Sequence, residues 1–282
     1  MKDENNKKNI KNINNTKIIF IDIDGTLVNN RKRITLKTRK AIKQVVDKGI
    51  YVVLTSGRDI LHTIDKSKRA LASNIIISSN GSEIYDYKQQ KLIYKNNIST
   101  EKVYQIWDYC NKKHIGIMIK SFEGKLINKY LIGKDKENGI IITNKKELKN
   151  ILVSQIIFIS NDIELILSTK EFIQSLDLSV NHYSNSFLDA TISDRYSLDI
   201  NNKGVSKGEG VKKLLKHLNI SKEESMCFGD YYNDLDMFKA CNIKVAMGNA
   251  CNELKKEADY ITDTNNKNGV ANFLNKYFKE EK

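Results

Sequence analysis

Three short, continuous apolar runs alternate with amphipathic segments in the first 80 residues, and this alternation limits the folds open to the chain. The runs cover residues 17–23, 50–54 and 75–79, and they are rich in isoleucine and valine. Continuous β-branched runs of this length are typical of strands buried on both faces, as in parallel sheets. The resulting β-α-β-α-β order predicts an α/β fold with a parallel sheet and helices on both of its faces.

The pattern changes near residue 86 and returns near residue 197. Between these points, strands and helices are expected in mixed order, which is typical of an α+β unit. The expected strands cover residues 115–120, 156–160, 178–182 and 188–192. Two helices are expected among them, and one begins after Asn144, with Glu147 completing a capping box. The chain has 282 residues, which is longer than most single domains.

These boundaries predict three parts of the chain. A polar, disordered leader is expected over residues 1–16. A Rossmann-like parallel-sheet core is expected from residues 17–85 and 197–282, interrupted by an inserted α+β cap at 86–196.

Composition and charge restrict the partners of the chain. There are 47 Lys and Arg residues against 34 Asp and Glu, for a formal net charge of +13. Such an excess can indicate nucleic-acid or membrane binding, but here the basic residues are spread along the whole chain, which favours a solvated surface. The four cysteines lack Cys-x-x-Cys spacing, so reduced thiols are expected.

No apolar run approaches the roughly 18–20 residues that span a bilayer, and residues 1–17 lack the apolar centre of a signal peptide. We therefore expect a cytoplasmic protein, with no nucleic-acid or membrane partner, that is a monomer or a weak homo-oligomer.

Two carboxylates follow the first predicted strand, in the sequence Asp22-Ile23-Asp24-Gly25. In open α/β sheets, ligands and catalytic groups gather at the carboxyl ends of the strands. An ordinary Asp-Gly turn would give the same pattern, so this pair alone leaves a structural role open. A calcium-binding EF-hand loop fits less well, because Thr26 stands where that loop needs an acidic residue or Asn.

Three later segments place further polar groups at strand ends or helix starts. Ser56 and Gly57 follow the second predicted strand, Lys207 precedes a predicted helix, and Asp230 and Asn233 follow another strand. Hydroxyl and backbone N–H groups at such positions suit phosphate oxygens, and two carboxylates suffice to anchor Mg²⁺. Each segment also has a plain structural alternative, because serine, asparagine and aspartate commonly cap helices.

In this order, the motifs strongly resemble those of the haloacid dehalogenase-like phosphohydrolases, and specifically their Cof-like branch. The matching segments are Asp22-x-Asp24-Gly25-Thr26-Leu27, Ser56-Gly57-Arg58, residues 78–86, residues 205–208, Gly229-Asp230-x-x-Asn233-Asp234 and residues 246–250. The resemblance runs from about Lys17 to Phe278, although the expected cap matches only in layout. Two positions depart from the family pattern. Asp59 stands where relatives often have proline, and Tyr231-Tyr232 stands where smaller or polar residues are usual.

The resemblance implies a Mg²⁺-dependent phosphatase, a phosphoric monoester hydrolase that acts on small phosphorylated metabolites through an aspartyl-phosphate intermediate. It implies that Asp22 is the nucleophile, that Asp24 is the general acid and base, and that Lys207 completes the catalytic set. The implied metal ligands are the side chains of Asp22 and Asp230 and the backbone carbonyl of Asp24. The implied phosphate-binding groups are Ser56, Lys207, Asn233 and the backbone amides of Ile23 and Gly57.

Several alternatives remain at this point. A haloacid dehalogenase would lack the second acid, so Asp24 argues against that activity. A phosphomutase or phosphotransferase of the same fold stays open, and a catalytically inactive, basic nucleic-acid-binding protein would have little reason to keep these motifs. Because every candidate catalytic residue lies outside residues 86–196, we expect that segment to form a lid that selects the substrate.

Overall fold

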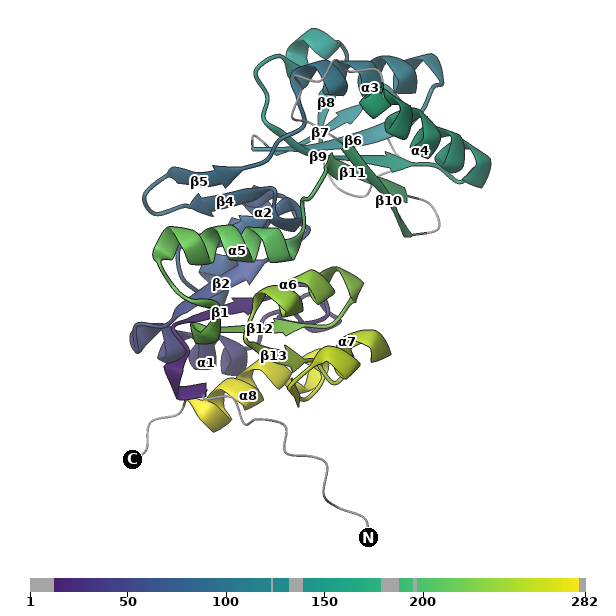
Figure 1. The fold of residues 1–282 in the computed structure, drawn as a ribbon. Helices are drawn as coiled ribbons and strands as arrows, with labels where there is room; N and C mark the ends of the chain where they lie inside the picture. The colour runs from purple at the N-terminus through teal and green to yellow at the C-terminus, as the bar shows by residue number, and fades with distance from the viewer. Residues whose placement is uncertain (1–12, 123, 132–138, 179–187, 195–196, 279–282) are drawn as a thin grey trace. The chain divides into compact units, whose positions relative to one another are not determined.

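The computed structural model describes residues 13–122, 124–131, 139–178, 188–194 and 197–278, and it divides the chain into two compact units. The first unit comprises Met1–Gly57, His62–Ile93 and Ser206–Lys282, and the second comprises Arg58–Leu61 and Tyr94–Val205. Each unit is built around its own β-sheet (Figure 1).

The sheet of the first unit has eight strands in the order β14-β13-β12-β1-β2-β3-β4-β5. The strands are β1 (Ile18–Ile21), β2 (Tyr51–Thr55), β3 (Ile75–Ser78), β4 (Glu83–Asp86), β5 (Lys91–Lys95), β12 (Ser225–Gly229), β13 (Ile243–Ala246) and β14 (Tyr260–Ile261). The six strands from β14 to β3 run parallel, and β4 is antiparallel to β3. This parallel core confirms the predicted α/β class and the three strands predicted in the first 80 residues.

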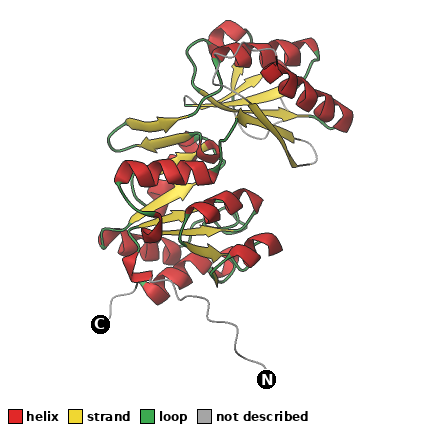
Figure 2. Ribbon diagram, viewed as in Figure 1, coloured by secondary structure: helices red, strands yellow, loops and turns green. Residues whose placement is uncertain are grey.

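Helices cover both faces of this sheet (Figure 2). They are α1 (Leu36–Asp47), α2 (Ile60–Ala70), α5 (Lys207–Leu218), α6 (Leu235–Ala240), α7 (Asn252–Glu257) and α8 (Gly269–Tyr277). The start of α1 follows from its sequence, because the Thr35 hydroxyl accepts a hydrogen bond from the backbone N–H of Thr38. The same helix ends before Gly49, whose φ of 81° lies in the left-handed region that favours glycine.

The sheet of the second unit has six strands in the order β10-β11-β9-β6-β7-β8. They are β6 (Gly116–Ser121), β7 (Gly124–Asn128), β8 (Ile140–Ile142), β9 (Val153–Ile159), β10 (Leu188–Asp194) and β11 (Ser197–Asn202). Its neighbours pair antiparallel except for β7 and β8. Helices α3 (Thr100–Lys112) and α4 (Ile163–Leu178) contribute Trp107 and Ile173 to an apolar core that also holds Phe158 of β9.

Three predictions need correction. The strand predicted at 178–182 is wrong at its first residue, because Leu178 ends α4, and residues 179–182 lie outside the described residues. The helix after Asn144 has the expected capping box, but it is a 3₁₀ helix over Lys145–Leu148. The predicted disordered leader extends too far, because Ile13–Asn15 form a 3₁₀ helix that buries the Ile13 side chain.

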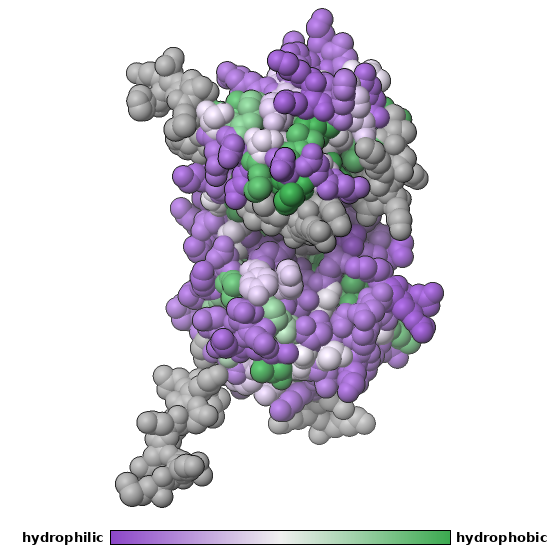
Figure 3. Space-filling view, turned by 90° about the vertical axis from the view of Figure 1, so that its right-hand side faces the viewer, coloured by the Kyte–Doolittle hydropathy of each residue, from purple (hydrophilic) through white to green (hydrophobic). Residues whose placement is uncertain are grey.

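Among the described residues, no helix combines the length and apolarity needed to cross a membrane. On the face drawn in Figure 3, hydrophilic residues prevail and the hydrophobic ones form separate patches.

Candidate functional site

The candidate site lies at the carboxyl ends of three neighbouring strands of the first unit. Ile21 at the end of β1 is in register with Phe228 of β12 on one side and with Leu54 of β2 on the other. Asp22, Ser56 and Asp230 therefore leave the sheet at the same edge, where ligands of parallel α/β sheets bind.

A buried ion cluster links two of these strand ends to helix α5. The Lys207 ammonium, in the first turn of α5, donates hydrogen bonds to Asp22 Oδ1 at 2.6 Å and to Asp234 Oδ1 at 2.7 Å. The exposed fractions of the three side chains are 1% for Lys207, 6% for Asp22 and 0% for Asp234. Buried charges are stable only when they are paired in this way, so loss of one partner would leave another uncompensated.

Asp234 also shapes the loop that carries Asp230. Its second oxygen, Oδ2, accepts hydrogen bonds from the backbone N–H groups of Asp230 at 2.9 Å and Tyr231 at 3.2 Å. The hydrogen bond between Lys207 and Asp234 was not predicted from the sequence. The available signal was the place of Asp234 as the last residue of the Gly-Asp-x-x-Asn-Asp motif.

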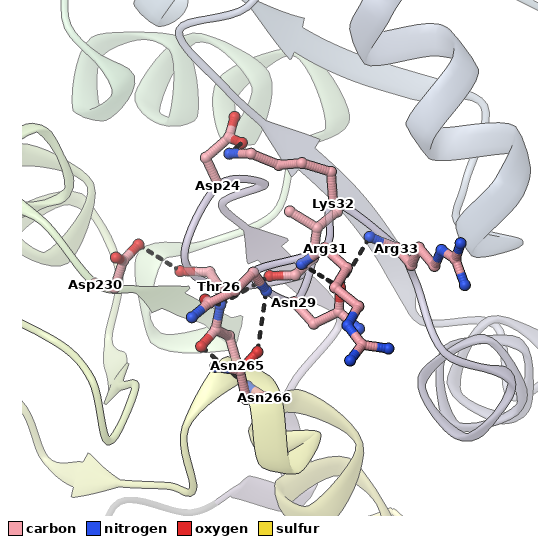
Figure 4. A network of polar contacts seen from close by, with 11 residues as sticks. Asp24, Thr26, Asn29, Arg31, Lys32, Arg33, Asp230, Asn265 and Asn266 are labelled. Atoms are coloured by element: carbon pink, nitrogen blue, oxygen red, sulfur yellow. Dashed lines mark hydrogen bonds and ion pairs between the residues drawn. The ribbon is translucent and has the colours of Figure 1, made fainter.

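Asp230 approaches the turn that follows Asp22. Its Oδ1 accepts a hydrogen bond from the Thr26 hydroxyl at 2.9 Å, which Figure 4 shows. A Cβ atom at Gly25 would lie 2.1 Å from Asp230 Oδ2, and Gly25 has a φ of 80°. Glycine is thus required at this position both for its backbone conformation and for the close approach of the carboxylate.

The environment shifts the pKa values of these groups. Burial raises the pKa of Asp22 to about 8; the Lys207 ammonium opposes this rise, and the nearby carboxylates of Asp234 and Asp230 add to it. Burial also raises the pKa of Asp230 to about 6, against the effect of the Thr26 hydrogen bond. For Lys207, burial alone would lower the pKa, but Asp22 and Asp234 outweigh it and hold the pKa above its ordinary value.

These carboxylates fit a divalent cation. Asp22, Asp230 and Asp234 each offer an oxygen within 4.8 Å of the others, the one such cluster found in the described part of the chain. Mg²⁺ prefers carboxylate oxygens and needs only one or two of them from the protein. Because Asp234 already binds Lys207 and two backbone N–H groups, Asp22 and Asp230 are the more suitable pair.

Asp24 is oriented differently from Asp22. Its side chain is 37% exposed, and its Oδ1 accepts a hydrogen bond from the Lys32 ammonium at 2.8 Å. Figure 4 shows the Lys32 side chain reaching back to Asp24 from the turn that follows.

The remaining predicted site residues differ in burial. Ser56 is buried, and its backbone N–H and C=O bond to Ile77 and Asn80 at the end of β3. A Cβ atom at Gly57 would lie 2.8 Å from the Asn80 side-chain oxygen, so a larger residue at position 57 would require the Asn80 side chain to shift. Ile23 is buried in the turn after β1, whereas Asn233 is exposed.

Asn249 supports the turn after Asp22, which the sequence did not reveal. Its side-chain amide donates a hydrogen bond to the Gly25 carbonyl at 2.8 Å, and its Oδ1 accepts one from the backbone N–H of Asn265 at 2.9 Å. The residue lies in one of the segments that carry the family resemblance, but a hydrogen bond across more than 200 residues has no signature in local sequence.

Comparison with known proteins supports the family resemblance of the sequence motifs. The profile of the haloacid dehalogenase-like hydrolase family matches residues 19–274. The chain is 34% identical to the 5-amino-6-(5-phospho-D-ribitylamino)uracil phosphatase YcsE of Bacillus subtilis, over 90% of this chain and 93% of that protein.

Solved structures show the same fold. The crystal structure of TM0651 from Thermotoga maritima superimposes with a TM-score of 0.80 at 26% identity, covering 93% of this chain and 97% of that one. The sugar phosphatase BT4131 gives a TM-score of 0.73 at 25% identity, over 93% of this chain and 99% of that one.

Several relatives are named phosphatases, which confirms the prediction of an enzyme of the phosphoric monoester hydrolase type. The family profile extends over all three segments of the first unit and includes the second unit. The chain therefore belongs to the haloacid dehalogenase-like hydrolases.

Proposed function

We propose that the protein is a Mg²⁺-dependent phosphatase that hydrolyses small phosphorylated metabolites through a phosphorylated Asp22. The observation that carries this proposal is the environment of the Asp22 carboxylate. It is nearly buried, accepts a hydrogen bond from Lys207 at 2.6 Å and has an oxygen within 4.8 Å of an Asp230 oxygen, which is close enough for the two to bind one cation. A carboxylate held among compensating charges is suited to nucleophilic attack on an anionic phosphoryl group.

The reaction takes two steps. In the first, an Asp22 oxygen attacks phosphorus, the bond from phosphorus to the leaving oxygen breaks, and Asp24 gives that oxygen its proton. In the second, Asp24 takes a proton from a water molecule whose oxygen attacks phosphorus, the aspartyl-phosphate bond breaks, and inorganic phosphate leaves. The two carboxyl groups need opposite protonation states at the start: Asp22 must be ionised to attack, and the partly exposed Asp24 must hold the proton that it donates.

The other proposed groups bind and neutralise the phosphoryl oxygens. Lys207 supplies a fixed positive charge, because its two carboxylate partners hold it protonated. We assign the Ser56 hydroxyl, the Asn233 amide and the backbone N–H groups of Ile23 and Gly57 to the same task. Mg²⁺, held by Asp22, Asp230 and the Asp24 carbonyl, would keep the Asp22 carboxyl ionised and neutralise charge on the phosphoryl group.

Small metabolites are the proposed substrate class because two relatives bear such names. One is named for a phosphorylated ribitylaminouracil and the other is described as a sugar phosphatase. A phosphotransferase of the same fold would share the first step and differ only in the acceptor of the second.

A panel of phosphorylated metabolites, assayed with Mg²⁺ for released phosphate, tests the proposal. It should include sugar phosphates, the phosphorylated ribitylaminouracil and p-nitrophenyl phosphate. We expect phosphate release from at least one metabolite, and none after chelation. Transfer of phosphate to a second metabolite without release would establish a phosphotransferase, and inactivity toward the entire panel would contradict the proposal.

A further inference from the structure

The turn from Asn29 to Arg33, which follows the Asp22–Asp24 segment, is closed by its own hydrogen bonds. The Asn29 side-chain oxygen accepts hydrogen bonds from the backbone N–H groups of Arg31 and Arg33, both at 3.0 Å. The backbone of Asn29 exchanges two more hydrogen bonds, with the N–H of Lys32 at 2.8 Å and the carbonyl of Arg33 at 3.1 Å. The conformation of this turn is therefore specified by the turn itself.

Distant residues anchor the same turn. The Asn265 amide donates hydrogen bonds to the Val28 carbonyl at 3.0 Å and to the Asn30 side chain at 3.1 Å. The backbone N–H of Asn30 donates to Asn266 Oδ1 at 3.0 Å. Figure 4 shows Asn265 and Asn266, which lie in the 3₁₀ helix just before α8. The turn is thus fixed to the body of the first unit at a second point.

Within this turn, Lys32 adopts a backbone conformation that is unfavourable for its residue type. Its φ is 57°, in the left-handed region that costs a residue with a Cβ atom about 1 kcal/mol or more. Surrounding hydrogen bonds can maintain such an outlier, and outliers of this kind cluster at functional sites.

The Lys32 side chain places its ammonium 2.8 Å from Asp24 Oδ1. The neighbouring Arg31 and Arg33 side chains point away from Asp24 in Figure 4. The exposed fraction is 64% for the Lys32 side chain and 37% for that of Asp24, and ion pairs open to solvent contribute little to stability. The hydrogen bonds of the turn hold the Lys32 ammonium 2.8 Å from Asp24 Oδ1. Because this ion pair adds little stability, its position is better explained by an effect on where the Asp24 carboxyl lies than by an effect on folding.

We propose that Lys32 is a positioning residue that restricts where the Asp24 carboxyl lies relative to the leaving oxygen. This inference rests on the proposed function, because it needs Asp24 to be the general acid. It extends the catalytic machinery by one residue from outside the motifs. A proton donor must lie within hydrogen-bond reach of the atom it protonates. If the Asp24 carboxyl is held less firmly in place, the step that needs its proton becomes slower.

The test compares two leaving groups in the full-length protein. An alkyl phosphate from the metabolite panel needs protonation of its leaving oxygen, whereas p-nitrophenolate leaves without it. For Lys32→Ala, we expect kcat/KM for the alkyl phosphate to fall about fivefold and that for p-nitrophenyl phosphate to change less than about twofold, a small part of the usual effect of general acid catalysis. Lys32→Arg, which keeps a cation within reach, should recover most of the loss.

Arg31→Ala is the matched control, because it removes a neighbouring positive charge whose side chain points away from Asp24. It should leave both kcat/KM values unchanged, and thermal melting should show that all three variants are folded. Equal losses on both substrates, no loss on the alkyl phosphate, or the same loss in Arg31→Ala would overturn the inference. Asp24→Asn separates the two proposals. If Asp24→Asn leaves alkyl phosphate hydrolysis unchanged, the proposed function fails. If Asp24→Asn lowers this hydrolysis and Lys32→Ala does not, only the role of Lys32 fails.

Discussion

The two units of the protein use their buried residues differently. At one sheet edge of the first unit, Asp22, Asp234 and Lys207 form a buried ion cluster beside Asp230. The largest core cluster of the second unit is apolar, with Trp107, Phe158 and many isoleucines between the sheet and its helices. Burial of ions costs free energy that an apolar core does not, so such a cluster is better explained by chemistry than by stability. Substitutions in this ion cluster should therefore affect turnover, and substitutions in the apolar core of the second unit should affect folding.

The largest expected effect is the loss of turnover in Asp22→Asn. An amide is neither a nucleophile toward phosphorus nor a good metal ligand, so kcat should fall by at least about a thousandfold, as is usual for loss of a covalent nucleophile. Phosphate release with Mg²⁺ measures the loss, and circular dichroism checks that the fold is kept. Residual activity above about one part in a thousand would show that this cluster is not the chemical centre.

The opposite outcome is expected for Phe158→Ala in β9 of the second unit. Phe158 is fully buried, so truncation should lower the free energy of unfolding by about 3–5 kcal/mol. Denaturant unfolding measures this change. At a temperature where the variant is folded, its kcat for p-nitrophenyl phosphate should stay near the wild-type value. A loss of kcat in the folded variant would mean that the second unit takes part in the chemistry.

The comparison also predicts where specificity resides. All the proposed site residues belong to the first unit, so we assign substrate selection to the second. Replacing residues 96–205, which belong to the second unit, by a short linker should spare p-nitrophenyl phosphate hydrolysis far better than hydrolysis of a metabolite phosphate. We expect the ratio of the two kcat/KM values to change by about tenfold or more, the range that pocket contacts supply. An unchanged ratio in a folded protein would contradict this assignment.

The two units also differed in how well the sequence predicted them. In the first unit, continuous apolar runs and cap residues such as Thr35 predicted β1, β2, β3 and α1, because buried parallel strands have an unambiguous pattern. In the second unit, β7, β8 and β11 were missed, and Leu178 was placed in a strand although it ends a helix. Short strands of a mixed sheet, without strong turn signals, leave strand and helix indistinguishable by periodicity.

The candidate site was predictable to the extent that it lies in short motifs. Strand ends placed Asp22 and Asp230 at one edge, which the registers of β1 and β12 bear out. The partnership of Lys207 with Asp234, and that of Lys32 with Asp24, depend on how helices and turns pack. These contacts between distant or differently packed segments cannot be predicted from local sequence.

A dependence of Mg²⁺ stabilisation on pH also distinguishes the ion cluster from an apolar core. Because the pKa of Asp22 is raised to about 8 and that of Asp230 to about 6, both carboxyls hold protons at lower pH, where they compete with the cation. In the metal-free protein, a raised carboxyl pKa contributes stability at low pH that is lost as the pH rises through these values. Mg²⁺ binds the ionised carboxylates and restores that stability. Its stabilising effect should therefore be larger at pH 8 than at pH 6, reaching about 2–3 kcal/mol near saturation. Thermal melting with and without Mg²⁺ at the two pH values measures it, and Asp230→Asn should abolish most of the difference. A stabilisation that is equal at both pH values would mean that these carboxyls do not bind the cation.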